Sequence, residues 1–413
     1  MKSLRELYRI GKGPSSSHTM GPQRAAQLFL ERCSNASSYE VTLYGSLAAT
    51  GKGHMTDVAI EEVLHPHHTV SIIWKPQVFL PFHPNGMKFV GRDVNGDIID
   101  EWTVYSIGGG ALSDGIDGHD ELGASEVYDL NKMSDIQSWC YDNGRSFWEY
   151  VEKCEDKEIW DYLKTIWQTM KEAIRRGLDH EGVLPGPLNL PRKAATYYTK
   201  AKGYRASLQS RGLVYAYALA VSEENASGGT IVTAPTCGAC GVLPAVLYHM
   251  QEAHDMSEQR ILRALATAGL VGNIVKHNAS ISGADVGCQG EVGVACAMAS
   301  AAACQLFGGS PAQVEYAAEM GLEHHLGLTC DPVCGLVEIP CIKRNSAGAV
   351  NAVASAQLSL AGIKSAIPAD EVIDSMRRIG NDMPKCLKET GEGGLAVTET
   401  AQKLRAYQGS SEK

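Results

Sequence analysis

The sequence predicts an α+β protein of two domains, an N-terminal α/β domain and a C-terminal all-α domain that carries most of the cysteines. The chain has 413 residues, enough for more than one domain, and its hydrophobic content of 44% is ordinary for a globular protein. Short segments rich in β-branched and aromatic residues occur before residue 110, whereas apolar residues at helical spacing dominate after residue 145. We therefore place the α/β domain at 1–145, a long helix with a linker at 146–190 and the helical domain at 191–413.

The N-terminal half alternates strand-like and helix-like segments. The strand-like segments are short, and polar or glycine-bearing turns separate them. The helix-like segments carry apolar residues at helical spacing. The predicted strands are 39–44, 69–74, 87–92 and 98–106, and the predicted helices are 21–33 and 55–64.

The C-terminal half predicts consecutive helices. Residues 148–178 carry apolar side chains at helical spacing with many charges, which predicts a first long helix, and a proline- and glycine-bearing loop follows over 180–193. No strand is expected beyond this loop, and the last five residues, GSSEK, are expected to form a frayed tail. The other predicted helices are 207–223, 257–277, 290–306, 311–325, 346–362 and 368–380, joined by glycine-rich turns.

Composition excludes several classes of protein. The formal net charge of −10, with no basic stripe, argues against a nucleic-acid partner. The start of the chain has no apolar signal-peptide core, and its most apolar runs are too short to span a bilayer. We therefore expect a cytoplasmic protein without a membrane partner, whose thiols stay reduced. Nine of the twelve cysteines lie from position 237 onward, which indicates buried packing, a metal site or catalysis.

Two glycine loops in the first domain each carry a histidine. Neither GKGPSSSH (11–18) nor GKGH (51–54) has the spacing of a phosphate-binding P-loop. Hydroxyls directly before a helix can cap it or bind an anion, and the repetition of the theme favours a small-anion site. A third histidine cluster, HPHH (65–68), is expected to be a surface loop. The candidate side chains are Ser15, Ser16, Ser17, His18 and Thr19 in the first loop, and His54, Thr56 and Asp57 in the second.

Two further short motifs allow alternative interpretations. SGGT (227–230) could cradle the phosphate of pyridoxal phosphate, although such segments are common as plain turns. CGAC (237–240) has CxxC spacing, but no second CxxC or histidine pair follows at the distance a structural zinc site requires. A thioredoxin-like role would need a βαβ context, which this region lacks.

The remaining cysteines divide by their surroundings. Cys296 and Cys304 lie in an alanine-rich helical segment, where cysteine packs as a small hydrophobe. Cys288 lies among glycines and beside acids in GADVGCQGEVG, and TCDPVCGLVEIPC (329–341) places further cysteines in a second loop. Three thiolates from two loops could hold an iron–sulfur cluster with one iron free of protein ligands, and such an iron is a Lewis acid.

A resemblance to a known family rests on five long and unusual strings: SSSHTMGPQRAA (15–26), GKGHMTD (51–57), NASISGADVGCQGEVGVA (278–295), EHHLGLTCDPVCGLVEIPC (323–341) and KRNSAGAVNA (343–352). With them, the chain resembles the iron–sulfur-dependent L-serine dehydratases of bacteria in their single-chain form, over nearly its whole length. The resemblance implies a [4Fe-4S] cluster on Cys288, Cys330 and Cys341. It also implies a first domain similar to an allosteric substrate-binding domain, a helical second domain that carries the cluster, and a homodimer.

The reaction implied by the resemblance is loss of water from L-serine to an enamine, which hydrolyses to pyruvate and ammonia. It needs a held carboxylate, a base for the Cα proton and a stabilised hydroxide. His18 or His54 is the expected base, because imidazole titrates near neutral pH. The expected substrate-binding residues are Ser15, Ser16, Ser17, Thr19, Thr56, Asn278, Ser280, Lys343, Arg344 and Asn345, which implies an active site between the two domains.

Two other functions fit parts of this pattern. The same elimination could use pyridoxal phosphate, with SGGT on the phosphate, and a redox or serine sensor would need no turnover. Serine, threonine and cysteine stay alternative substrates, because no side-chain pocket is identifiable. The chain also departs from some members of the family: no cysteine follows Cys386, so capping of the fourth iron by a terminal thiol is not expected, and the roles of Cys237, Cys240 and Cys334 are left open.

Overall fold

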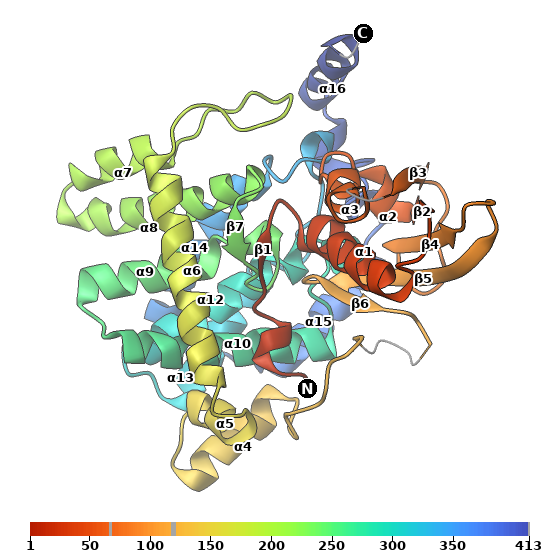
Figure 1. Ribbon diagram of the computed structural model, residues 1–413. Helices are drawn as coiled ribbons and strands as arrows, with labels where there is room; N and C mark the ends of the chain where they lie inside the picture. The colour runs from red at the N-terminus through yellow and green to blue at the C-terminus, as the bar shows by residue number, and fades with distance from the viewer. Residues whose placement is uncertain (66–67, 117–120, 412–413) are drawn as a thin grey trace.

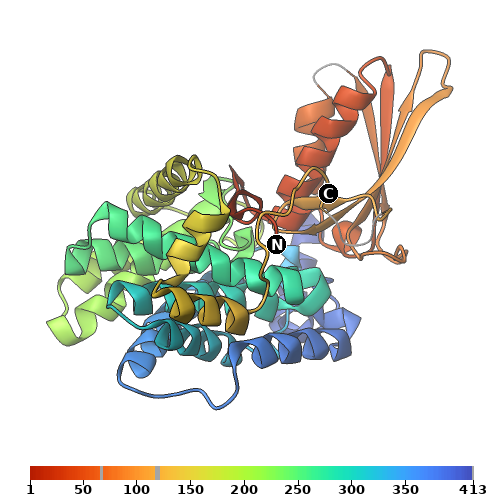
Figure 2. The same ribbon diagram turned by 90° about the horizontal axis from the view of Figure 1, so that it is seen from below.

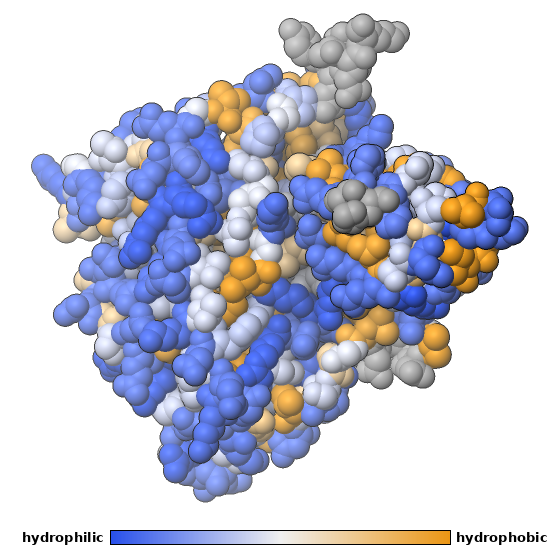
Figure 3. Space-filling view, in the orientation of Figure 1, coloured by the Kyte–Doolittle hydropathy of each residue, from blue (hydrophilic) through white to orange (hydrophobic). Residues whose placement is uncertain are grey.

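The computed structural model describes residues 1–65, 68–116 and 121–411, with the backbone alone over 406–411. A five-stranded sheet region stands beside a larger helical region (Figures 1 and 2). Hydrophilic residues dominate the face drawn in Figure 3, and hydrophobic residues form small patches there, several of them over the sheet region. Among the residues described, no helix combines the length and the apolar character needed to cross a membrane.

The sheet has the strand order β3-β2-β4-β5-β6. β2 pairs in parallel with β3, and the other neighbouring strands are antiparallel. All four predicted strands are confirmed, and β6 is added to them. The strands are β2 (Ser38–Tyr44), β3 (Thr69–Lys75), β4 (Gly86–Arg92), β5 (Ile98–Gly108) and β6 (Ala111–Ser113).

Side-chain alternation decides which face of the sheet is covered. Phe89 of β4 packs into a buried cluster with α1 (Gly21–Arg32) and α3 (Thr56–Leu64), the two helices predicted for this half. Lys88, the residue before it, points to the opposite face and pairs with Glu101 of β5 at 2.8 Å. One face is therefore apolar and packed against helices, whereas Lys88 and Glu101 lie on the other face. Figure 2 shows the helices along one face of the sheet.

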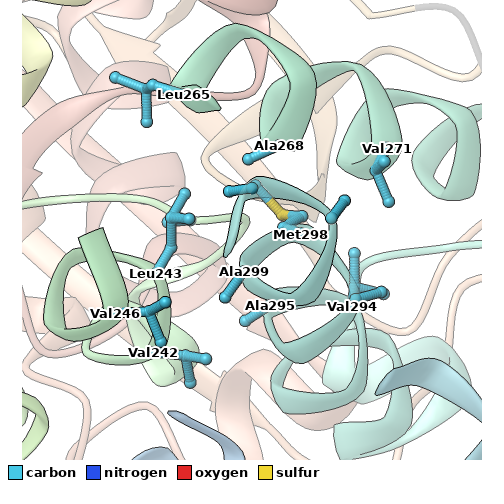
Figure 4. Close-up of a cluster of buried hydrophobic side chains, with 14 of the residues drawn as sticks. Val242, Leu243, Val246, Leu265, Ala268, Val271, Val294, Ala295, Met298 and Ala299 are labelled. Atoms are coloured by element: carbon cyan, nitrogen blue, oxygen red, sulfur yellow. The ribbon is translucent and has the colours of Figure 1, made fainter. Parts of the chain in front are cut away.

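The helical region is built around α12 (Val292–Leu306), in which every residue except Gln305 is buried. Figure 4 shows Met298 and Ala299 of α12 among apolar side chains of α9 and α10. Small alanine side chains allow these helices to pack closely. The other helices of eight or more residues are α4 (Met133–Asn143), α5 (Phe147–Cys154), α6 (Ile159–Asp179), α7 (Ala194–Lys202), α8 (Ala206–Ala226), α9 (Val242–His254), α10 (Glu258–Asn278), α13 (Pro311–Glu323), α14 (Cys341–Leu360), α15 (Ala369–Asp382) and α16 (Glu399–Ser411).

The long helix predicted over 148–178 is wrong, because the chain breaks between α5 and α6. Glu155 leaves the helical conformation, with φ −83° and ψ 161°. Its carboxylate instead accepts hydrogen bonds from the Leu4 backbone N–H at 2.7 Å and from the Ser3 hydroxyl at 2.8 Å. A contact with the start of the chain thus overrides the local helical pattern.

The prediction of no strand in the second half is also wrong. Strand β7 (Thr230–Val232) pairs antiparallel with β1 (Ile10–Lys12). Three residues are too few to show alternation, and the partner lies more than two hundred positions away. This two-stranded ribbon joins the first glycine loop to the helical region.

The structure adds helices that were not predicted and corrects the expectation for the tail. Helices α4, α7 and α9 lie outside the predicted helices, and α16 extends to Ser411, so residues 409–411 are helical rather than frayed. The last two residues of GSSEK and the middle two of HPHH (66–67) lie outside the described residues.

The start of the chain packs with the helices. Leu4, Leu7 and Tyr8 belong to the same buried cluster as α12, and so does Ile136 of α4. The Tyr8 hydroxyl donates to the Leu265 carbonyl at 2.9 Å. The chain therefore forms the sheet between two segments, its first residues and α4, that both pack into the helical core.

Candidate active site

The first histidine loop is clamped onto the helical region. The Gly13 backbone N–H donates to the Gly229 carbonyl at 3.2 Å, and Asn225 Nδ2 donates to the Pro14 carbonyl at 2.8 Å. SGGT (227–230) is thus part of the turn that holds this loop through β7. We call the meeting point of the loops the junction; it comprises residues 15–20, 46–56, 236–241, 282–291, 329–331, 341 and 389.

A single π-helical turn directly before α1 buries His18. The Ser15 hydroxyl accepts from the His18 backbone N–H at 3.0 Å and lies 3.4 Å from the Ser17 hydroxyl. The Ser16 hydroxyl accepts from the Cys237 backbone N–H at 3.4 Å. Three buried hydroxyls are therefore gathered within one turn of the imidazole.

Thr19 and Thr56 tie the two histidine loops to each other. Thr19 Oγ1 donates to the His54 carbonyl at 2.7 Å, and Thr56 Oγ1 donates to the His18 carbonyl at 2.5 Å. The two imidazole rings lie 4.6 Å apart, centroid to centroid. Since both threonine protons are used on the backbone, these two residues position the histidines.

Hydrogen-bond partners define which nitrogen of each imidazole is basic. His18 Nε2 lies 3.1 Å from the Ser46 carbonyl, an obligatory acceptor, so Nε2 carries the proton and Nδ1 accepts from the Ser17 hydroxyl at 2.9 Å. Thr50 Oγ1 donates to the Ser46 carbonyl at 3.2 Å, so it accepts from His54 Nδ1 at 3.1 Å, which leaves the lone pair on His54 Nε2. Burial lowers the pKa of His18 to about 4 and that of His54 well below its usual value, so both rings are neutral near pH 7.

Glu389 brings a carboxyl group to these imidazoles from near the end of the chain. Its Oε1 lies 3.6 Å from His18 Nδ1 and 3.9 Å from His54 Nε2. Burial raises the pKa of Glu389 to about 8. The carboxyl is therefore mainly protonated near pH 7, and its contacts with the neutral rings are not ion pairs.

The three predicted cluster cysteines come together beside this group. A hydrogen bond with the Cys288 thiol, together with burial, raises the pKa of Cys330, and Glu291 Oε2 lies 3.5 Å from Cys288 Sγ. Burial and the nearby charge of Cys288 raise the pKa of Cys341, the first residue of α14. The Glu389 backbone N–H donates to the Cys330 carbonyl at 2.7 Å, so the thiols and the imidazoles occupy one junction.

Glycines allow the loops to approach so closely. A side chain at Gly283 would place its Cβ 2.6 Å from Glu291 Oε2 and 3.0 Å from Cys330 Sγ. A side chain at Gly53, in the second histidine loop, would place its Cβ 2.6 Å from the Gly335 carbonyl oxygen. At Gly53 the contact is with backbone and cannot be relieved locally, and at Gly283 the Glu291 side chain would have to shift, which explains why both positions favour glycine.

The thiols also have a fixed cation nearby. Arg344 donates to the Thr329 carbonyl at 2.6 Å and to Asp331 Oδ1 at 3.0 Å. Although burial opposes it, the charges of Cys288 and Asp331 raise the pKa of Arg344. Three thiols from separate segments beside a held guanidinium fit a thiolate-ligated metal group, because the cation offsets the negative charge of the ligands.

Two other predicted residues of α14 do not face the thiols. Lys343 is exposed. Asn345 is buried, with Nδ2 donating to the Gly238 carbonyl at 2.7 Å and Oδ1 accepting from the Gly241 N–H at 2.9 Å. Asn345 thus holds the CGAC turn against α14.

The predicted residues at the end of α10 lie beside a different hollow. Asn278 Nδ2 donates to the Asn131 carbonyl at 2.6 Å. Ser280 accepts from the Ser282 N–H at 3.1 Å and lines a cavity of about 610 Å³ between α10, α15 and the loop before β4.

The structure also places the five other cysteines that the sequence analysis singled out. Burial raises the pKa of Cys296 to about 12 and that of Cys304 to about 11, as for thiols packed among alanines. Burial also raises the pKa values of Cys237 and Cys240 in the CGAC turn. Cys334 is half-buried next to a small apolar cluster that includes α16.

Sequence reasoning missed Glu389, Glu291 and Thr236. Thr236 Oγ1 donates to Glu291 Oε1 at 2.8 Å, which orients that carboxyl toward the thiols. Glu291 could have been found, because it lies in the same glycine loop as Cys288. Glu389 shows only a weak signal, the glycine-rich stretch that follows it.

Side chains that could hold a metal ion, the thiols of Cys288 and Cys330 among them, thus lie beside paired neutral imidazoles where an α/β region meets a helical one. The family described as serine dehydratase beta chain matches residues 3–69, and the family described as serine dehydratase alpha chain matches residues 51–396. The chain belongs to the serine dehydratase family, with the alpha and beta parts fused in one chain.

Curated relatives cover almost the whole chain. The L-serine dehydratase of Haemophilus influenzae is 39% identical, across 96% of this chain and 99% of its own length. The L-serine dehydratase of Streptomyces coelicolor is 40% identical across 96% and 98%, and L-serine dehydratase 1 of Escherichia coli is 40% identical across 96% and 99%. The resemblance expected from the five sequence strings is confirmed, and with it the expectation of an enzyme of this family.

Proposed function

We propose that this chain converts L-serine to pyruvate and ammonia with the help of a [4Fe-4S] cluster. The observation that carries the proposal is the adjacency of three thiols and two neutral imidazoles, joined by the hydrogen bond from Glu389 to Cys330. Similarity to relatives named L-serine dehydratase over 96% of the chain supports L-serine as the substrate.

Cys288, Cys330 and Cys341 would hold the cluster. When bound by three protein ligands, it supplies an iron with an open position, a Lewis acid suited to a hydroxyl leaving group. Arg344 stays paired with Asp331 and keeps positive charge beside the thiolates. The glycine at position 283 keeps the space beside Cys330 free.

His54 is the favoured base for the Cα proton. Its Nε2 retains a lone pair, because Nδ1 is engaged with Thr50, and the ring is neutral near pH 7. His18 Nδ1 already accepts from the Ser17 hydroxyl, so this second imidazole is less available. Thr19 and Thr56 hold the two rings in register through the backbone.

The hydroxyls of Ser15 and Ser16 are placed to receive the substrate carboxylate, whereas the Ser17 hydroxyl already donates to His18 Nδ1. All three are buried in the turn that carries His18, and hydroxyl donors can replace the water that a carboxylate loses on binding. The homodimer, the cytoplasmic location and the domain boundaries at 1–145, 146–190 and 191–413 stay predictions from sequence.

Purification without oxygen tests the proposal. We expect a brown protein with about four iron ions per chain, as a cluster of this type holds, that forms pyruvate from L-serine. Pyruvate formation by iron-free protein, with a lysine Schiff base trapped by borohydride, would favour pyridoxal phosphate instead. An iron-loaded protein that binds L-serine without turnover would favour the sensor.

A further inference from the structure

Among the described residues, one carboxyl oxygen at the junction has no hydrogen-bond partner. Glu389 is only 5% exposed, and its buried Oε2 receives no hydrogen bond from the part of the chain that the structure describes. Its Oε1 stands 3.6 Å and 3.9 Å from the nearest nitrogens of His18 and His54, longer than a hydrogen bond. Leaving a buried acceptor unpaired is costly, and native proteins usually tolerate it where something else supplies the donor.

The backbone holds this carboxyl rigidly in place. Glu389 has φ +57°, a left-handed conformation that a residue with a Cβ rarely adopts. Its N–H donates to the Cys330 carbonyl at 2.7 Å, and its carbonyl accepts from the Ser46 hydroxyl at 2.8 Å. Both neighbours belong to the junction, one on the thiol side and one on the imidazole side. A strained residue fixed from both sides indicates a functional placement.

The polar groups of an amino-acid substrate identify the missing donor. In the proposed function, the hydroxyls of the first loop receive the carboxylate and the metal receives the β-hydroxyl, so the α-ammonium group still needs an acceptor. Glu291 is directed elsewhere, because Thr236 donates to its Oε1 at 2.8 Å and its Oε2 faces the sulfur of Cys288, a proposed metal ligand, at 3.5 Å. The carboxylate of Asp331 is likewise engaged on both oxygens. Glu389 Oε2 is the acceptor left among these three carboxyl groups.

We propose that Glu389 binds the α-ammonium group of the substrate and so makes the site select amino acids over hydroxy acids and other carboxylic acids. This inference rests on the proposed function, since it assumes an amino-acid substrate at the junction. The bound ammonium group donates to Oε2 and lies beside the imidazoles, which places the adjacent Cα–H near His54 Nε2. Glu389 therefore acts in recognition, and the histidine acts on the proton.

Calorimetric binding of two unreactive ligands to the holoenzyme tests this role. L-Alanine and propanoate differ only in the α-ammonium group, so the ratio of their dissociation constants isolates its recognition. We expect wild-type enzyme to prefer L-alanine by about tenfold or more, as one charge-assisted hydrogen bond can provide. Glu389→Gln, which keeps the shape but replaces one carboxyl oxygen by an amide NH2 that can only donate, should reduce this preference to about twofold.

Controls separate recognition from general damage. Glu338→Gln is matched, because Glu338 is also buried with an unpartnered Oε2 but lies beside Gly186 in the loop after α6, and it should keep the wild-type ratio. If Glu389→Gln fails to fold, Glu389→Asp tests the same role. The shorter side chain withdraws the carboxyl oxygen, so L-alanine should bind more weakly while the dissociation constant of propanoate stays unchanged.

The outcomes that overturn the role of Glu389 are distinct from failure of the proposed function. Glu389 is only structural if its variant raises the dissociation constants of both ligands equally, or if the active wild-type enzyme does not prefer L-alanine to propanoate. Absence of pyruvate formation from L-serine by the iron-loaded wild type would count against the proposed function itself.

Discussion

The interior around α12 and the junction are both buried, but they accommodate polar groups differently. In α12, the single hydroxyl of Ser300 donates to the Cys296 carbonyl at 2.7 Å, and the other buried side chains are apolar or thiol-bearing. At the junction, hydroxyls, imidazoles, carboxyls and thiols are buried together, and no described residue donates to Glu389 Oε2. An unsatisfied buried group costs about 1–3 kcal/mol. The contrast indicates that the helical interior is built for stability and the junction for a ligand.

Cysteine-to-serine substitutions in the two regions should give the largest difference between them. Cys288→Ser, Cys330→Ser and Cys341→Ser should each abolish the brown colour and the activity, because a serine hydroxyl does not replace a thiolate ligand of iron. Iron content, visible absorbance and pyruvate release measure the effect. Cys296→Ser and Cys304→Ser, in α12, should keep both colour and activity. A coloured and active Cys330→Ser enzyme would refute the assignment.

The second largest effect concerns the imidazoles. His54→Ala should lower kcat by about two to four orders of magnitude, the usual loss for a missing general base, while the iron content stays at the wild-type level. His18→Ala should lower kcat less, since its basic nitrogen is engaged with Ser17. A larger loss for His18→Ala at full iron content would reverse the two roles.

A buried histidine outside the junction should affect stability rather than activity, and its effect should depend on pH. His249 is 2% exposed, its Nε2 lies 2.8 Å from the Ser210 hydroxyl, and burial lowers its pKa to about 4. The unfolded chain binds a proton near pH 6.5 that the folded chain binds only near pH 4. The free energy of unfolding should therefore fall as the pH drops through this window, by about 3 kcal/mol in full for this group.

His249→Gln removes that titration. The decrease in unfolding temperature between pH 7 and pH 4.5 should be smaller in the variant than in wild type, because the glutamine takes up no proton. Pyruvate formation at pH 7 should be unchanged, since His249 lies in α9 away from the thiols. Equal decreases in the two proteins would show that His249 is protonated at its ordinary pKa in the fold.

The smallest expected effect comes from added bulk. Gly283→Ala pushes a methyl group against Glu291 and Cys330, and overpacking of this kind typically costs about 1–3 kcal/mol. We expect weaker iron retention during dialysis against a chelator. Gly203→Ala is the matched control, because the nearest atom to its added Cβ is the Lys200 carbonyl oxygen at an ordinary 3.5 Å. Identical iron loss in both variants would mean that the loop around position 283 accommodates the methyl group without weakening iron retention.

Local patterns account for what could be predicted of the fold. Alternation in β4 and helical spacing in α1 and α3 involve neighbours within a few positions, so these elements were found with nearly correct bounds. The break at Glu155 and the β1–β7 ribbon depend on partners far away in the chain, and no local pattern reveals them. The same holds for α4, whose apolar residues pack on the helical core rather than on the sheet that precedes it.

The family, the candidate ligands Cys288, Cys330 and Cys341, and the two histidine loops were predictable from residue types alone, because unusual residues in glycine-rich surroundings are visible without a fold. The folded chain was needed to show that Lys343 is exposed and that Asn345 holds a turn. It also shows that Glu389 faces the imidazoles, through a contact with Ser46 that spans 343 positions. The physical reason is that the partners available to a buried polar group, and hence its protonation and its role, are set by segments that meet only when the chain folds.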